Sequence, residues 1–100
     1  MTTIRWTLQA VEDLEAIRDY VSRDSAHYAR LLVDRLYHSV DRLSTHPESG
    51  RIVPEFQRPE RREVILGSYR IVHRLKAGTA EVLTVFHGAR LFPKTVEGAL

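Results

Sequence analysis

The feature that most constrains the fold is a change in apolar spacing along the chain. Between residues 10 and 43, apolar side chains recur every three or four positions, as they do in amphipathic helices. From residue 63 onward, short strand-like segments are separated by turns that contain glycine. A helical half followed by a sheet-forming half, within 100 residues, predicts one α+β domain.

The N-terminal half predicts two helices. Their apolar stripes are Ala10, Leu14, Ile17 and Val21, then Ala29, Leu32, Val33, Leu36, Val40 and Leu43. Thr7 is expected to cap the first helix, and Asp24 or Ser25 the second. Pro47 and Gly50 are expected to end the second helix after about five turns. Because the connection is short, the two helices should form an antiparallel hairpin.

The remaining segments predict a small sheet. Strands are expected at residues 4–6, 63–66, 69–75 and 81–86. Turns at 67–68 and 77–79 join the last three strands, whereas residues 50–62 form a charged loop. Alternation along the third strand places Tyr69, Ile71, His73 and Leu75 on one face and Arg70, Val72 and Arg74 on the other.

These elements give the order β-α-α-β-β-β. The helical hairpin is expected to pack on one face of a small, mainly antiparallel sheet, and the other face should stay partly open. The domain covers residues 1–100, and the apolar tail 91–100 should be loose unless a partner or a target binds it.

Composition excludes several classes of protein. The chain has no cysteine, so disulfides and zinc–thiolate sites are excluded. The five histidines lack the spacing of metal ligands, and no metal or cofactor is expected. The N-terminus has no signal-peptide pattern, and no apolar stretch approaches the roughly 20 residues that span a bilayer. We therefore expect a cytoplasmic protein that does not bind membranes.

Charge is distributed unevenly between the two halves. Residues 1–50 carry six Arg against eight acids, a net charge of −2. Residues 51–90 carry seven Arg and one Lys against four acids, a net charge of +4. Arginine suits bidentate contacts to phosphate or carboxylate. The strand arginines Arg70 and Arg74 could bind such a target, or they could pair with Glu81 and Glu63 on neighbouring strands.

Several short segments together carry a family resemblance. They are Trp6-Thr7, Ala10, Asp13-Leu14, residues 47–51, Val53-Pro54-Glu55, residues 69–74 and residues 87–90. In this order and spacing, the chain resembles the ParE/RelE toxin superfamily of bacterial type II toxin–antitoxin modules. The resemblance implies the β-α-α-β-β-β fold, a role in plasmid stabilization and a hetero-oligomer with a cognate antitoxin. It also implies one of two activities.

RelE-like members cut mRNA on the ribosome as metal-independent endoribonucleases. Their pattern places lysines where this chain has Arg61 and Glu63, and a tyrosine near Val96. The carboxylate of Glu63 would repel the phosphate that the lysine should hold, which argues against this chemistry. The arginines of the pattern are kept, at Arg70 and Arg90.

A second ribonuclease pattern of the superfamily uses a loop Glu, a strand Arg and a late His. Glu55, Arg62 and His87 match these roles, but Gly88 stands where an aromatic residue should stack on a base. His87 could serve as a general acid, or it could simply end its strand.

ParE-like members lack the catalytic set and poison DNA gyrase by trapping its complex with cleaved DNA, without being enzymes themselves. The His-Gly-x-Arg ending favours this branch. The expected target-binding residues are then Arg61, Arg70, Arg74, His87 and Arg90. A third possibility is an inactive member that keeps only antitoxin binding.

Overall fold

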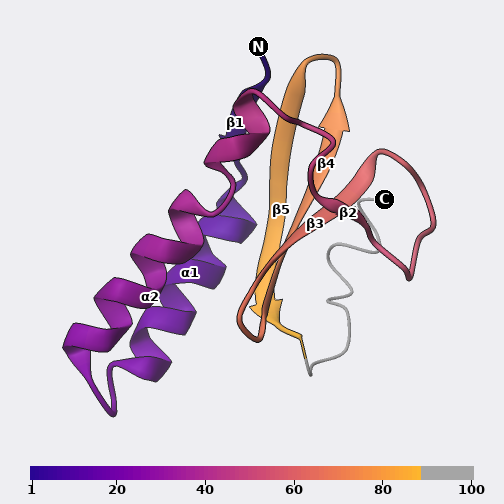
Figure 1. The fold of residues 1–100 in the computed structure, drawn as a ribbon. Coiled ribbons are helices and arrows are strands. Elements are labelled where there is room, and N and C mark those ends of the chain that lie inside the picture. Colours follow the sequence, from indigo (N-terminus) through magenta and orange to yellow (C-terminus); the bar gives the residue numbers. More distant parts are fainter. Residues whose placement is uncertain (89–100) are drawn as a thin grey trace.

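The computed structural model describes residues 1–88, in which two helices cover one face of a five-stranded sheet (Figure 1). The strands are β1 (Thr3–Trp6), β2 (Arg51–Ile52), β3 (Arg61–Leu66), β4 (Tyr69–Lys76) and β5 (Thr79–His87). The helices are α1 (Leu8–Val21), α2 (Ala26–His38) and the 3₁₀ helix η1 (Asp41–Ser44). The sheet order is β1-β5-β4-β3-β2, with β1 parallel to β5 and the other pairs antiparallel. The predicted α+β fold is confirmed.

Both long helices begin at the predicted caps. The Thr7 hydroxyl accepts a hydrogen bond from the Ala10 backbone at 3.3 Å, and the Ser25 hydroxyl accepts one from Tyr28 at 3.1 Å. Each cap satisfies a backbone N–H that has no partner within its helix.

The predicted end of the second helix was wrong. α2 stops at His38, and the Ser39 hydroxyl donates to the Leu36 carbonyl at 2.7 Å. The chain then passes through Val40 into η1, and both Val40 and Leu43 remain buried. Because a 3₁₀ turn keeps nearly the same spacing as an α-helix, the apolar pattern continued although the α-helix had ended.

The segment predicted as a loop also contains a strand. Arg51 and Ile52 form β2 against Glu63 and Arg62, so that part of the 50–62 prediction was wrong. A strand of two residues has no alternation that a sequence pattern could reveal.

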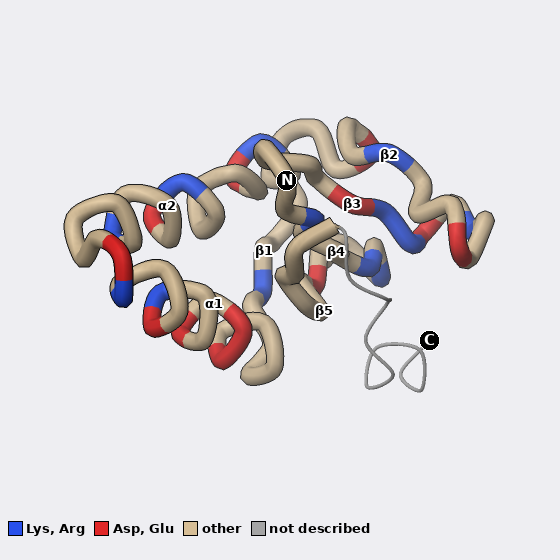
Figure 2. The backbone as a smooth tube through the Cα atoms, turned by 90° about the horizontal axis from the view of Figure 1, so that it is seen from below, with Lys and Arg blue, Asp and Glu red and all other residues tan. Residues whose placement is uncertain are grey.

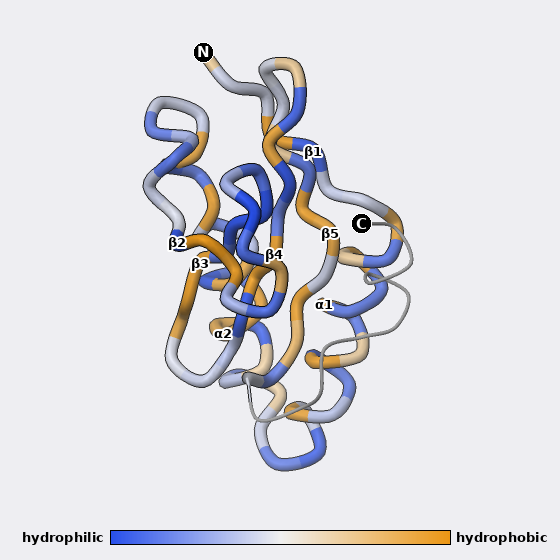
Figure 3. Tube along the Cα trace, turned by 90° about the vertical axis from the view of Figure 1, so that its right-hand side faces the viewer, coloured by the Kyte–Doolittle hydropathy of each residue, from blue (hydrophilic) through white to orange (hydrophobic). Residues whose placement is uncertain are grey.

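The main core lies between the helices and the sheet. Leu14, Leu36, Ile71, Val82 and Val85 are among its buried members. Figure 3 shows hydrophobic residues along β5 and the end of β3. Burial of such side chains stabilises the fold by about 1.5–3 kcal/mol each.

A second, smaller cluster packs on the other face of the sheet. Val53, Val72 and Phe86 are buried there, and Phe56 packs against them. The segment between β2 and β3 therefore covers part of the face that is opposite the helices, and it brings its own charged residues onto that face.

None of the helices in residues 1–88 is both long and apolar enough to cross a membrane.

Candidate functional site

A buried carboxylate organises the arginines on the face opposite the helices. The Glu63 side chain has no exposed surface, and its two oxygens accept hydrogen bonds from Arg51 Nε at 2.5 Å and Arg70 Nε at 2.6 Å. The register brings Arg51 beside Glu63 on β2, whereas Arg70 comes from β4. The two guanidinium groups offset the free-energy cost of burying the negative charge of Glu63.

A second carboxylate completes the coordination of Arg70. Arg70 donates from Nη1 and Nη2 to the two oxygens of Glu55, both at 2.8 Å, and its guanidinium lies 5.3 Å from the centre of the Phe86 ring. The hydrogen bond from Arg70 holds the pKa of Glu55 below its usual value, and the Glu55 carboxylate raises the pKa of Arg70. We call Arg51, Glu55, Glu63 and Arg70 the Glu63 cluster.

A similar arrangement stands at the other end of this face. Arg74 Nε donates to Glu81 at 3.0 Å, and Arg5 pairs with the same carboxylate. The alternative in which Arg70 and Arg74 pair with neighbouring acids is therefore what the structure shows. Figure 2 shows the basic and acidic residues placed close together on β3 and β4.

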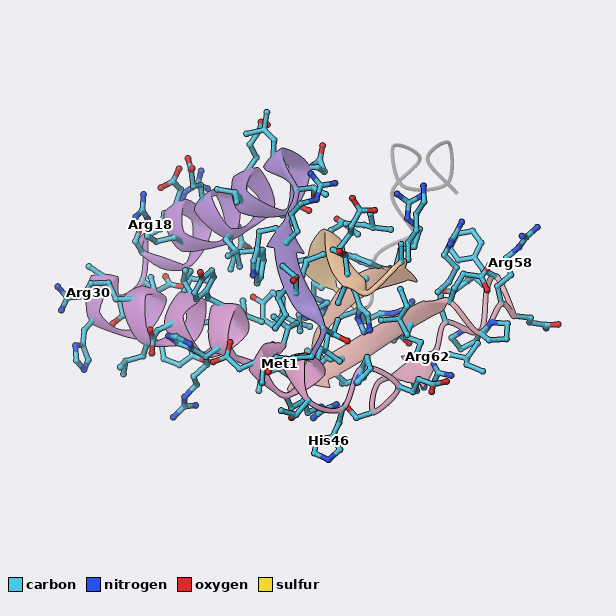
Figure 4. The ribbon with its side chains drawn as sticks, turned by 90° about the horizontal axis from the view of Figure 1, so that it is seen from above. Met1, Arg18, Arg30, His46, Arg58 and Arg62 are labelled. Carbon is cyan, nitrogen blue, oxygen red and sulfur yellow. The ribbon has the colours of Figure 1, made fainter. Side chains whose placement is uncertain are left out.

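Arg62 is engaged with the backbone. It donates to the carbonyls of Pro59, Glu48 and Gly50 at 2.8, 3.1 and 2.9 Å. Figure 4 shows it at the side of the molecule that carries β2 and β3. These bonds fix the course of the chain around Gly50.

His87 lies on the opposite face of the sheet from Glu55. It is paired with Tyr69 across β4 and β5, and their rings meet edge to face at 5.5 Å. Tyr69 packs against the main core, whereas its neighbour Arg70 points to the other face. The predicted ribonuclease set of Glu55, Arg62 and His87 is therefore divided between two faces.

His87 lines a groove of about 920 Å³ between α1 and the end of β5. Ile17, Tyr20 and Tyr69 contribute to its walls. At its edge, Asp13 accepts hydrogen bonds from the Thr84 hydroxyl and from the Val85 backbone, at 2.5 and 3.0 Å. Asp13 thus takes the place of a strand partner where β1 no longer covers β5.

Of the predicted target-binding residues, Arg61, Arg70 and Arg74 share one face, His87 lies on the other, and Arg90 falls outside the described residues. Sequence reasoning did not indicate the contacts made by Arg5, Arg51 and Asp13. Arg5 and Arg51 bind the carboxylates of Glu81 and Glu63, and Asp13 accepts hydrogen bonds at the edge of β5. Arg51 gave no signal because β2 has only two residues. Within residues 1–88, no three His, Cys, Asp or Glu side chains are grouped so as to hold a metal ion.

Comparison with known proteins is consistent with this fold. Residues 4–92 match the sequence profile of a family described as the ParE toxin of the type II toxin–antitoxin system parDE. Toxin RelE2 of Caulobacter vibrioides is 33% identical over 91 residues, which cover 91% of this chain and all of that protein.

Two solved structures resemble the chain. One is the chromosomal ParDE system of P. aeruginosa, with a TM-score of 0.73 and 26% identity over 87% of this chain and 96% of that one. The other is the RelBE2 toxin–antitoxin complex of Mycobacterium tuberculosis, with a TM-score of 0.55 and 19% identity over 86% of this chain and 96% of that one. The second likeness bears on the fold alone.

Proposed function

This chain belongs to the ParE toxin family of type II toxin–antitoxin systems, and we propose that it poisons DNA gyrase by binding the enzyme while its DNA is cut. In this role the toxin catalyses nothing itself. It prefers one state of another enzyme, and a preference of about 5 kcal/mol is enough to trap most of the population in that state.

The observation that carries the proposal is the state of Arg70. A metal-free ribonuclease needs a base for the 2′-hydroxyl, cations for the phosphate and an acid for the leaving oxygen. Here all three donor nitrogens of the Arg70 guanidinium are bonded to Glu55 or Glu63. Glu55, the candidate base, lies on one face of the sheet and His87, the candidate acid, lies on the other. The two side chains therefore could not act on the same phosphate.

An antitoxin is the proposed partner in the cytoplasm, and the two proteins would form a hetero-oligomer. The groove between α1 and β5 combines apolar walls with Asp19, Arg23 and His87 at its rim. An amphipathic segment of the antitoxin suits such a surface. The solved relatives named above come from toxin–antitoxin systems, which supports the proposal.

Ribosome-dependent mRNA cleavage is the second candidate. The 33% identity to a protein named Toxin RelE2 favours it.

Induced expression in a bacterial host tests the choice between them. We expect a DNA-damage reporter to rise before protein synthesis falls, because a trapped gyrase leaves broken DNA. Glu55→Gln should keep full toxicity, since Glu55 binds no target in this proposal. Early arrest of protein synthesis with cut mRNA, together with loss of toxicity in Glu55→Gln, would establish the ribonuclease instead.

A further inference from the structure

A row of charged residues crosses four strands on the face opposite the helices. Arg61 on β3 is paired with Arg74 on β4, Arg74 with Glu81 on β5, and Glu81 with Arg5 on β1. Residues paired across neighbouring strands point to the same face of a sheet. We call Arg5, Glu81, Arg74 and Arg61 the cross-strand row. It is separate from the Glu63 cluster.

The row has more positive than negative charge. Glu81 is 8% exposed and binds both Arg5 and Arg74. Arg61 lies 3.8 Å from the carboxylate of Glu60, which is also 3.9 Å from Arg58. Lys76 follows Arg74 by two positions on β4 and is exposed. Among residues 1–88, Arg5, Arg58, Arg61, Arg74 and Lys76 therefore stand against Glu60 and Glu81, a net charge of +3 at this end of the sheet.

These cations repel one another. Burial lowers the pKa of Arg61, Glu60 opposes that effect, and the charges of Arg74 and Arg58 lower the pKa further. An anion placed over the row would relieve this repulsion. The side chains of Arg5, at one end of the row, and of the flanking residue Arg58 are 62% and 63% exposed, so both can reach an external ligand.

The dimensions and composition of the row indicate which anion fits. Three steps between strands span about 14 Å. This length matches about four base pairs of a DNA strand, at 3.4 Å each. The aromatic residues that the structure describes on this face are Phe56 and Phe86, and both pack in the smaller core cluster, with Phe86 only 5% exposed. Single-stranded RNA is usually bound by stacking of its bases on accessible aromatic rings, so this arrangement favours a duplex.

We propose that the cross-strand row, with Arg58 and Lys76, binds the phosphate backbone of duplex DNA. The role of this contact at gyrase rests on the proposed function: the toxin would hold the enzyme and the DNA that the enzyme has cut. The contact itself needs no gyrase and is tested without it.

The test is fluorescence anisotropy of the purified full chain with a short labelled DNA duplex, at about 50 to 200 mM salt. The double variant Arg58→Ala/Lys76→Ala removes two exposed cations beside the row. Each phosphate contact strengthens binding about eightfold when the salt concentration falls from 1 M to 0.1 M. We therefore expect each lost contact to weaken binding by about this factor at 0.1 M salt. It should also lower the slope of log K against log salt concentration by about 1. Glu60→Gln removes a carboxylate and should tighten binding.

The matched control is Arg18→Ala/Arg30→Ala. It removes the same charge from the helical hairpin, whose labelled arginines lie at the far end of the molecule from Arg58 in Figure 4. This control should bind duplex DNA like the wild type. Thermal melting of every variant shows that its fold is kept.

Equal weakening in the two double variants would overturn the proposal, because it would show an effect of net charge alone. Tighter binding to single-stranded RNA of the same length than to the duplex would also overturn it. Duplex binding through the row without any gyrase poisoning would support this inference while contradicting the proposed function.

Discussion

Glu63→Gln is expected to lower the free energy of unfolding by about 3 kcal/mol, because it breaks a buried ion-pair network from its centre. The Glu63 side chain has no exposed surface and accepts from both Arg51 and Arg70. Arg51 is 57% exposed and can be solvated again, so most of the cost arises at Arg70, which is 12% exposed. Glutamine also turns an NH₂ group toward one of these donors.

Urea unfolding followed by circular dichroism measures this loss of stability. The dependence of the unfolding free energy on urea concentration should be the same in the variant and the wild type. Glu48→Gln is the matched control, because Glu48 is 78% exposed and lies 3.6 Å from Arg62. Such a surface pair is worth about 0–1 kcal/mol. Equal losses in the two variants would show that Glu63 does not hold the cluster together.

The second large effect is expected at His73, which is fully buried in β4. Neither ring nitrogen has a hydrogen-bond partner within the described part of the chain. Burial lowers the pKa of His73 from 6.5 to about 4, and the nearby Arg62 and Arg42 charges act in the same direction, while the Ile71 backbone opposes them. Between these two pH values the unfolded chain binds a proton at this position and the folded chain does not.

The wild type should therefore lose about 3 kcal/mol of stability as the pH falls from 6.5 to 4. Above pH 6.5 His73 is neutral in both the folded and the unfolded chain, so none of this stability is lost. His73→Leu removes the titrating group and leaves no buried donor without a partner, so its stability should fall less over the same range. Unfolding free energies of both proteins at several pH values measure the difference.

His27→Gln serves as the control, because His27 is exposed on α2. It should follow the wild-type curve. His38 contributes in the opposite sense, since its bond to Asp41 raises its pKa, but it is exposed and is present in all three proteins. Parallel curves for the wild type and His73→Leu would contradict the account of His73.

Local signals in the sequence predicted most of the fold. Thr7 and Ser25 cap their helices as expected, and the turns at Gly67 and Gly78 join the last three strands. Both glycines have positive φ, a conformation that a glycine adopts without strain. Elements without a local signal were missed: β2 is too short to alternate, and η1 continues the spacing of the helix before it.

The candidate site was predictable in its residue types and only in part in its contacts. Cross-strand neighbours suggested that Arg70 and Arg74 could pair with Glu81 and Glu63, and the structure pairs Arg70 with Glu63 and Arg74 with Glu81. Glu55 reaches Arg70 from a segment that turns through Gln57 at a φ of 53°. No pattern foretells this turn, because glutamine rarely adopts such a φ. The separation of Glu55 from His87 depends on which face of the sheet the segment between β2 and β3 covers, and no local sequence pattern indicates that.

A gyrase cleavage assay would show whether this protein traps gyrase on cut DNA. Purified toxin is mixed with gyrase, supercoiled plasmid and ATP, and the reaction is stopped with detergent and protease. If the toxin poisons gyrase, linear DNA should accumulate with toxin dose and reach the same level with Glu55→Gln. No linear DNA, with supercoiling intact at every dose, would contradict it.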